Sequence, residues 1–282
     1  MRNASPLRYP GGKWRFTPFF VEFLSQNFKS PPLYIEPYAG GASLALSLLF
    51  DGRVSGIWLN DLDVAIHACW HSILHECERF CEELENTPVT LNEWHKQKNL
   101  YAKREAGDMF TLGFATFFLN RTNHSGILNG GVIGGKEQRG EWKLGARYNR
   151  PELIRRVQRI AENKKRIKLT CLDAGTLIRT LRRASNCLVY LDPPYVTAGK
   201  ALYMNAYRKE DHVSVRDAVH GLKRKWIVSY DDVPLVRKLY RINRCRHLEL
   251  LHTAREAKTG SEVLFFSDDC IIPKIPPKTK SL

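Results

Sequence analysis

The sequence lacks several features that would assign it to common classes of protein. No apolar run is long enough to span a bilayer, and the first residues contain no apolar core of a signal peptide. The seven cysteines are scattered along the chain and include no Cys-x-x-Cys pair. These absences argue against a membrane-spanning protein, a disulfide-stapled secreted domain and a zinc knuckle, and they predict a protein of the reducing cytoplasm.

Acidic residues are few compared with basic ones. Asp and Glu number 29 against 44 Lys and Arg, which gives a formal net charge of +15. A chain this basic favours a polyanionic partner, although charge alone does not separate DNA from RNA or from an anionic membrane. Its 282 residues are enough for one large domain or for one domain with a sizeable insertion.

The most informative stretch is residues 188–195, in which four apolar residues precede Asp192-Pro193-Pro194-Tyr195. The apolar run predicts a buried strand, and the prolines predict a stiff loop after it rather than a helix. Open α/β sheets bind their ligands at the carboxyl ends of strands. A carboxylate and a carbonyl there could accept hydrogen bonds from the two N–H groups of a planar amine. The ring of Tyr195 could stack on the face of that amine. The alternative is a strand end with a simple proline turn.

Two glycine-rich turns come earlier in the chain. In residues 6–14, Gly11 and Gly12 allow close approach of a ligand, and Arg8 and Lys13 add positive charge. The spacing is not that of a Walker P-loop, and an ordinary turn before a helix over residues 17–27 is the alternative.

The second turn, in residues 33–46, predicts a strand, a turn and an apolar helix, as in the first βα unit of a Rossmann-like fold without the strict G-x-G-x-x-G spacing. Glu36 at the strand end can meet a cationic amine, while Gly40 and Gly41 leave room for a ligand.

Two further predicted strands end in acids. Residues 54–60 lead to Asp61, about twenty residues after Gly40, where an acid commonly binds the ribose hydroxyls of a nucleoside. Residues 166–172 lead to Asp173, which could bond an adenine amino group of a nucleoside cofactor. For Asp61 the alternative is a cap on the helix that follows.

That helix carries His67, His71 and His75 four positions apart, so the three rings share a face. A zinc site is conceivable on this spacing. Because no second cluster of ligands completes a tetrahedral site, we favour an amphipathic helix with buried cysteines and predict no metal.

The segment between Asp61 and Asp173 interrupts the regular alternation of strands and helices. The two acids are 112 positions apart, whereas a βα repeat needs about thirty, so we expect an inserted subdomain. Residues 136–168 within it contain twelve Lys or Arg and four Glu, beside a glycine-rich loop. This composition suits contact with phosphates and bases, and a solvated basic face is the alternative. Helices are predicted over residues 92–105, 110–119 and 151–163.

The C-terminal part of the chain again predicts alternating helices and strands. We expect a mobile flap over residues 196–209, which contains Tyr203 and Tyr207, followed by a helix over 211–222 and a strand over 226–232. A closing strand over residues 261–267 should pair with residues 245–252. The Pro- and Lys-rich tail over 271–282 is expected to be flexible.

Together these segments resemble the Dam-type family of DNA adenine methyltransferases, over about residues 6–267. The stretch from Arg8 to Lys13 resembles the N-terminal cofactor motif of the family, with Tyr9 where a Trp is common. The stretch from Glu36 to Gly41 resembles its glycine-rich cofactor loop, and residues 192–195 match its catalytic motif residue for residue. The glycine-rich insert departs from the members that read GATC.

The resemblance implies an α/β fold: a Rossmann-like class I methyltransferase sheet with an inserted, mainly helical target-recognition subdomain. Residues 1–80 and 166–270 would form the catalytic domain, residues 81–165 the insert, and residues 271–282 a basic tail. S-adenosylmethionine would be the cofactor. The residues expected to bind it are Tyr9, Gly11, Gly12, Lys13, Glu36, Pro37, Tyr38, Gly40, Gly41, Ser43, Asp61, Asp173 and Asp192.

The implied reaction is methylation of the exocyclic N6 of an adenine flipped out of double-stranded DNA. Asp192 and the Pro193 carbonyl would bind both N–H groups and localise the nitrogen lone pair, and Tyr195 would stack on the base. Pro194 completes the catalytic motif. The residues expected to bind DNA are Arg8, Asn120, Arg121, Asn123, Lys136, Arg139, Lys143, Arg147, Tyr203 and Tyr207.

Three rival activities stay open on the sequence: methylation of cytosine N4, methylation of an RNA adenine, and DNA binding without catalysis. Asp at the head of the motif favours adenine by resemblance, and the intact motif argues against a pure binding protein. The expected location is the cytoplasm, on the nucleoid. A restriction endonuclease of the same specificity is the expected protein partner if the enzyme belongs to a restriction-modification system.

Overall fold

The computed structural model describes residues 4–9, 11–103, 108–181, 186–196, 207–252 and 258–274, with side chains described except at 248–252 and 258–261. Contacts divide the chain into two compact units. The first comprises Met1–Gly12 and Asp63–Cys171, and the second comprises Lys13–Leu62 and Leu172–Leu282. These limits differ from the boundaries predicted at residues 80 and 166, because the helix after Asp63 packs within the first unit.

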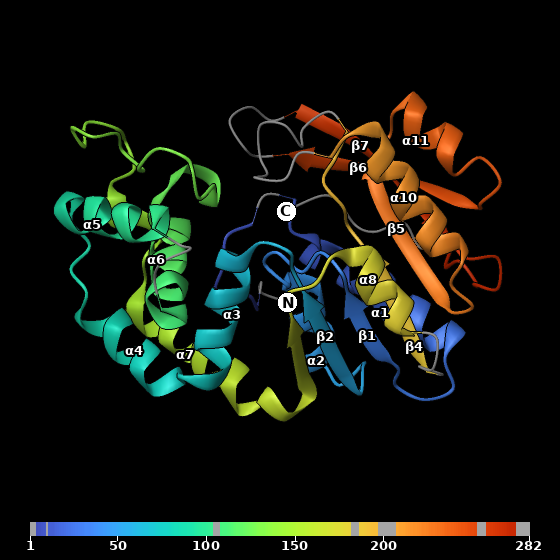
Figure 1. Ribbon diagram of the computed structural model, residues 1–282, viewed down its shortest axis with the longest axis horizontal. Coiled ribbons are helices and arrows are strands. Elements are labelled where there is room, and N and C mark those ends of the chain that lie inside the picture. The colour runs from blue at the N-terminus through green and yellow to red at the C-terminus, as the bar shows by residue number, and fades with distance from the viewer. Residues whose placement is uncertain are drawn as a thin grey trace. The chain divides into compact units, whose positions relative to one another are not determined.

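In the described part of the second unit, six strands belong to one mixed sheet, in the order β2-β1-β4-β5-β7-β6 (Figure 1). The pairs β1–β2, β1–β4 and β4–β5 are parallel, whereas β7 runs antiparallel to both β5 and β6. This arrangement confirms the predicted α/β fold and the predicted pairing of the closing strand with residues 245–252. The strands are β1 (Leu33–Glu36), β2 (Gly56–Asn60), β4 (Cys187–Leu191), β5 (Lys225–Asp231), β6 (Cys245–His252) and β7 (Lys258–Phe266).

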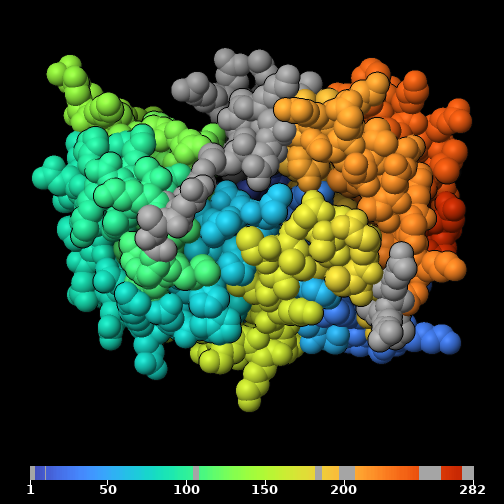
Figure 2. Space-filling view, in the orientation of Figure 1, coloured from blue at the N-terminus to red at the C-terminus, as the bar shows by residue number. Residues whose placement is uncertain are grey.

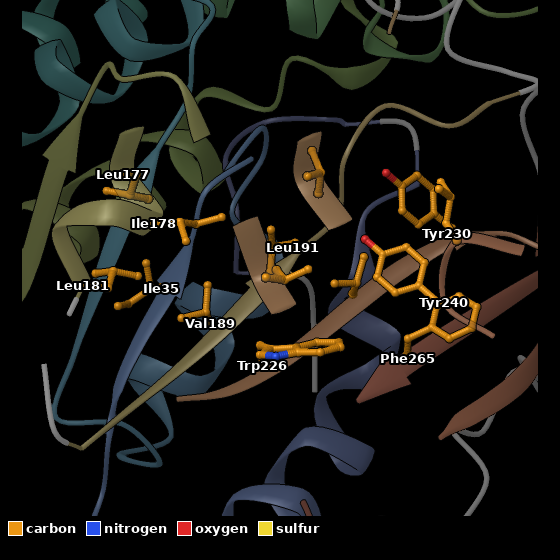
Figure 3. Packing of buried hydrophobic residues seen from close by; sticks show 14 of the residues in the cluster. Ile35, Leu177, Ile178, Leu181, Val189, Leu191, Trp226, Tyr230, Tyr240 and Phe265 are labelled. Carbon is orange, nitrogen blue, oxygen red and sulfur yellow. The ribbon is translucent and has the colours of Figure 1, made fainter. Parts of the chain in front are cut away.

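Side chains alternate between the two faces of this sheet, as strand geometry requires. Ile35, Val189 and Trp226 pack on one face with Leu177 of α8 (Figure 3). The same cluster includes Val219 of α10. On the other face, the rings of Phe19, Phe20 and Phe23 in α1 pack against Tyr34, Tyr190 and Phe266. The sheet therefore forms the middle of three layers. The helices of this unit are η1 (Lys13–Phe16), α1 (Thr17–Asn27), α2 (Ser43–Phe50), α8 (Ala174–Thr180), α10 (Lys209–His220) and α11 (Pro234–Leu239).

The first unit is mainly helical where the structure describes it. Gly113 lets α6 approach α3 closely, since a Cβ there would lie 2.4 Å from the Ala68 carbonyl oxygen. The predicted helices over 92–105, 110–119 and 151–163 are confirmed to within a few residues. Its elements are α3 (Val64–His75), α4 (Cys77–Asn86), α5 (Leu91–Ala102), α6 (Met109–Thr122), η2 (His124–Gly126), η3 (Leu144–Arg147), α7 (Arg150–Glu162), η4 (Lys164–Arg166) and β3 (Ile167–Thr170).

The histidine- and cysteine-bearing segment is two helices rather than one. The chain leaves helical geometry at Glu76, between α3 and α4. His71 and His75 lie with ring centroids 4.6 Å apart. Within the described ranges, no group of His, Cys, Asp or Glu side chains is arranged to hold a metal ion, and all seven cysteines are free thiols.

Two predictions fall partly outside the described residues. The flap is described only at residue 196 and from residue 207 onward, and the tail only up to residue 274. Of the helices in the described part of the chain, none combines the length and the apolar character needed to cross a bilayer.

Candidate active site

Polar side chains gather at one edge of the sheet in the second unit. Glu36 ends β1, Asp192 directly follows β4, Ser229 lies in β5 and Glu262 lies in β7. These strands are neighbours in the sheet order, so residues distant in the sequence come together there. This is the carboxyl edge of the parallel strands, where α/β sheets bind ligands.

Lys13 holds this group of acids together. Its Nζ lies 2.7 Å from Asp192 Oδ2 and 3.6 Å from Glu262 Oε1, and it donates to the Tyr195 hydroxyl at 2.8 Å. The Lys13 side chain is only 5% exposed. On the other side of the carboxylate, Ser229 Oγ donates to Asp192 Oδ1 at 2.7 Å. Both oxygens of Asp192 are therefore fixed in direction, and each retains a lone pair for a further donor.

Tyr195 is fixed at its hydroxyl end. Its hydroxyl donates to Glu262 Oε1 at 2.5 Å, and the Lys13 ammonium lies 5.3 Å from its ring centroid. A tyrosine held in this way presents its ring in one orientation, which suits stacking on a planar ligand.

The buried part of the site has more acids than cations. Burial raises the pKa of Glu36 to about 8, and the Tyr34 hydroxyl donates to Glu36 Oε1 at 3.1 Å. Burial also raises the pKa of Glu262, whose Oε2 is buried without a hydrogen-bond partner. Lys13 lies beside Asp192 and Glu262, and a cationic ligand bound next to these acids would favour the ionised forms of Glu36 and Glu262.

The glycine-rich turn after β1 is held by Asp61. Gly40 has a φ of 45°, which favours glycine, and its N–H donates to Asp61 Oδ2 at 2.8 Å. Asn60 adds a second tie, because its Nδ2 donates to the carbonyls of Pro37 and Leu172 at 3.0 and 2.8 Å. The predicted ribose-binding acid thus also shapes the turn. Gly41 and Ser43 are buried at the start of α2.

Asp173 has a local role that the sequence did not indicate. It caps α8, with Oδ1 accepting from the Thr176 N–H at 3.0 Å, and its side chain is exposed.

Tyr38, predicted to bind the cofactor, and Tyr207, predicted to bind DNA, are partners: their hydroxyl oxygens are 3.0 Å apart. Tyr203 lies outside the described residues.

The predicted residues of the first unit fall into two groups. Asn120 and Asn123 are buried. The Asn120 amide exchanges two hydrogen bonds with the backbone of Arg8, both 2.7 Å long. Asn123 accepts from Trp94 Nε1 at 2.7 Å and donates to the Ile127 and Leu128 carbonyls at 2.9 Å. Asn120 therefore holds the N-terminal segment and, through the Gly126 carbonyl at 3.0 Å, the loop that follows α6, which Asn123 also holds; neither amide faces solvent.

The second group is charged and lies at the surface. Lys136, Arg139, Lys143 and Arg147 are exposed. Arg121 is half-buried and donates to the Arg147 carbonyl, and desolvation lowers its pKa. In the N-terminal turn, Gly11 has a φ of 76° and the Gly12 N–H donates to the Tyr9 carbonyl at 3.1 Å.

Three site residues were not identified from the sequence: Asn60, Ser229 and Glu262. Ser229 lies within an apolar strand, and only the fold brings it beside Asp192. Glu262 carried a signal that could have been used, since an acid near the start of an otherwise apolar closing strand is costly to bury.

Two comparisons with known sequences give DNA methyltransferases. A family model described as D12 class N6 adenine-specific DNA methyltransferase matches residues 9–253. The type II methyltransferase M.MjaIII of Methanocaldococcus jannaschii is 24% identical over an alignment that covers 73% of each chain.

Solved structures are similar at lower identity. The rRNA methyltransferase aviRa from Streptomyces viridochromogenes has a TM-score of 0.40 at 13% identity, over 93% of this chain and 87% of that one. Protein LPL1258 from Legionella pneumophila has a TM-score of 0.34 at 14% identity, over 94% and 85% of the two chains.

The raised pKa of Glu36 predicts a pH-dependent stability. The folded protein keeps the Glu36 proton up to about pH 8, whereas the unfolded chain loses it near the ordinary value of 4.5. Glu36 therefore makes its full contribution to the stability of the folded protein below about pH 4.5, and this contribution is lost as the pH rises through 8. Glu36→Gln has no proton to lose, so the ligand-free variant should melt at a higher temperature than the wild type at pH 8 and at a similar temperature near pH 5.

Thermal denaturation across this pH range measures the difference. Glu85→Gln, at an exposed acid of α4, is the control and should follow the wild type throughout. Equal melting temperatures of Glu36→Gln and wild type at every pH would contradict the buried, protonated Glu36.

Proposed function

The chain belongs to the D12 class of N6 adenine-specific DNA methyltransferases, and we propose that transfer takes place at the sheet edge around Asp192. The enzyme methylates the exocyclic nitrogen of adenine in DNA and uses S-adenosylmethionine. The single observation that supports this location is the pair of hydrogen bonds from Lys13 and Ser229 that fixes both oxygens of the Asp192 carboxylate.

Asp192 acts on the target amine in this proposal. The adenine amino nitrogen is a weak nucleophile because its lone pair is delocalised into the ring. Asp192 accepts one N–H and the carbonyl of the buried Pro193 accepts the other, which draws the lone pair out of conjugation. Because Lys13 and Ser229 already orient the carboxylate, little reorganisation is needed at the moment of reaction.

Tyr195 stacks on the extruded base. Its hydroxyl is bound by Glu262 and Lys13, so the ring is positioned before the base arrives. Pro194 keeps the loop extended between Asp192 and Tyr195. The target must leave the duplex to reach this buried edge, as in other enzymes that act on bases.

The residues of the site fit the cofactor. S-adenosylmethionine supplies an electrophilic methyl group on a cationic sulfonium. Glu36 and Glu262, whose pKa values burial raises, would ionise beside a cation and so compensate its charge. The Gly40 turn held by Asp61 gives the close backbone approach that a nucleoside needs, and Asp61 lies on the ribose side of the cofactor in this proposal.

DNA recognition is assigned to the first unit. Four exposed cations, Lys136, Arg139, Lys143 and Arg147, are available to phosphates and base edges. Asn120 and Asn123 position the loop from within, since their amides are buried and bonded inside the unit. We further infer that the enzyme works in the cytoplasm, and that a restriction endonuclease of the same specificity is its partner. The likeness to a type II methyltransferase supports this inference.

Removing the acceptor should separate chemistry from cofactor binding. We expect Asp192→Ala to abolish methyl transfer while affinity for S-adenosylmethionine changes little, because in this proposal the carboxylate faces the target amine. Calorimetry with the cofactor and transfer of a labelled methyl group to duplex DNA measure the two properties. Asp51→Ala, at an exposed acid after α2, is the control. Turnover close to that of the wild type in Asp192→Ala would rule out this mechanism.

Single alanine variants of the four exposed cations should distinguish two kinds of DNA contact. A phosphate contact should weaken binding to all duplexes and lower the slope of log affinity against log salt by about one. A base contact should cost about 1–3 kcal/mol on the cognate site and relax specificity at one position. Lys238→Ala, at an exposed cation of α11, is the control.

The measurements are DNA binding at several salt concentrations and mapping of methylated sites in cells that express each variant. If all four variants keep the site preference and the salt dependence of the wild type, DNA recognition lies elsewhere in the chain.

A further inference from the structure

The loop over residues 133–144 in the first unit is organised around one glutamine, and we name it the Gln138 loop. Gln138 Nε2 donates to the carbonyls of Ile133 and Gly135 at 2.8 and 2.7 Å. Gln138 Oε1 accepts from the Leu144 N–H at 2.8 Å, and Lys143 Nζ donates to the Gln138 carbonyl at 2.7 Å. The two ends of the loop are therefore tied together through a single side chain.

Two glycines allow the loop to close tightly on itself. Gly134 has a φ of 84°, and a Cβ on it would lie 2.7 Å from the Trp142 carbonyl oxygen. A Cβ on Gly140 would lie 2.9 Å from the Gly134 Cα. The backbone of Trp142 is thus held against the opposite side of the loop, which fixes the point from which its side chain extends.

This closed loop presents a large aromatic ring to solvent. The Trp142 side chain is 54% exposed. The Arg147 guanidinium lies 4.9 Å from its ring centroid, and the Arg147 carbonyl is in turn bound by Arg121. Figure 2 shows the green surface of the first unit to which this part of the chain belongs. An exposed indole offers a large, flat ring on which a planar ligand can stack.

The surroundings of Trp142 favour a nucleic acid as that partner. Lys136, Arg139, Lys143 and Arg147 lie on the same stretch, with two acids, Glu137 and Glu141, of which Glu137 pairs with Arg139 at 3.0 Å. An aromatic ring among cations is the combination that binds nucleic acid bases by stacking and phosphates by charge.

We propose that Trp142 is a stacking residue for a DNA base, and that the Gln138 loop holds its ring in position. The inference rests on the proposed function, in which duplex DNA is the substrate of this unit. An exposed indole can stack on an unpaired base without regard to sequence, because every base has a flat face. The adjacent cations bind the flanking phosphates.

The test compares Trp142→Ala and Trp142→Phe in the full-length protein. Fluorescence anisotropy with a duplex of mixed sequence should show DNA affinity reduced about tenfold by alanine and less than about threefold by phenylalanine, which retains an aromatic face. The slope of log affinity against log salt should not change, since no phosphate contact is removed. DNA should quench tryptophan fluorescence less in Trp142→Ala than in the wild type.

Ile242→Ala is the matched control, because Ile242 is another exposed large apolar side chain, 73% exposed, and lies in the second unit. It should bind DNA as the wild type does. Affinity of Trp142→Ala within twofold of the wild type, with normal quenching, would overturn the inference. A salt slope flattened by several units in Trp142→Ala would also overturn it, because that result means that the whole loop and its cations have moved.

Failure of the wider proposal gives a different result. A wild-type protein that transfers no methyl group to duplex DNA contradicts the proposed function. Normal wild-type transfer combined with unaltered DNA affinity in Trp142→Ala contradicts only the stacking role.

Discussion

The ion pair between Lys13 and Asp192 is the interaction on which the site of the second unit depends. It joins the start of η1 to the end of β4 across 179 positions of sequence, with 2.7 Å between Nζ and Oδ2. Buried charges are costly unless they are paired, and here one ammonium serves Asp192, Glu262 and the Tyr195 hydroxyl together. Without Lys13, the acids at this edge would repel one another and the aromatic ring would lose one of its two anchors.

The sheet explains why this pairing can form. Parallel pairing of β1, β4 and β5 brings Glu36, Asp192 and Ser229 to one edge, and the antiparallel β7 adds Glu262 from the other direction. The layers of apolar side chains on both faces fix the register of these strands, since a slip of one residue would exchange the two faces. The geometry of the reactive edge is therefore a consequence of core packing, and the Gly40 turn held by Asp61 completes it on the cofactor side.

Many of the helices and strands could be predicted from the sequence, because local patterns of apolar residues, Gly and Pro determine them. The helix over residues 17–27 and the strands before Glu36, Asp61 and Asp192 follow from apolar periodicity and from the positions of Gly and Pro. Ser229 and Glu262 were missed because their roles depend on strand order, which local patterns do not contain. Asn120 and Asn123 were expected to face DNA, yet their amides are buried because backbone carbonyls of the loop after α6 need hydrogen-bond donors. The sequence also gave no reason to single out Trp142, because a lone aromatic residue in a polar loop has no periodicity.

The central claim is that Lys13 fixes Asp192 for reaction with the target amine. The most direct measurement is the single-turnover rate of methyl transfer by Lys13→Met, with cofactor and DNA both saturating and with folding checked by thermal denaturation. Because a carboxylate displaced by about 1 Å can cost about a hundredfold in rate, a decrease of at least that size is predicted. A single-turnover rate within threefold of the wild type would contradict the account.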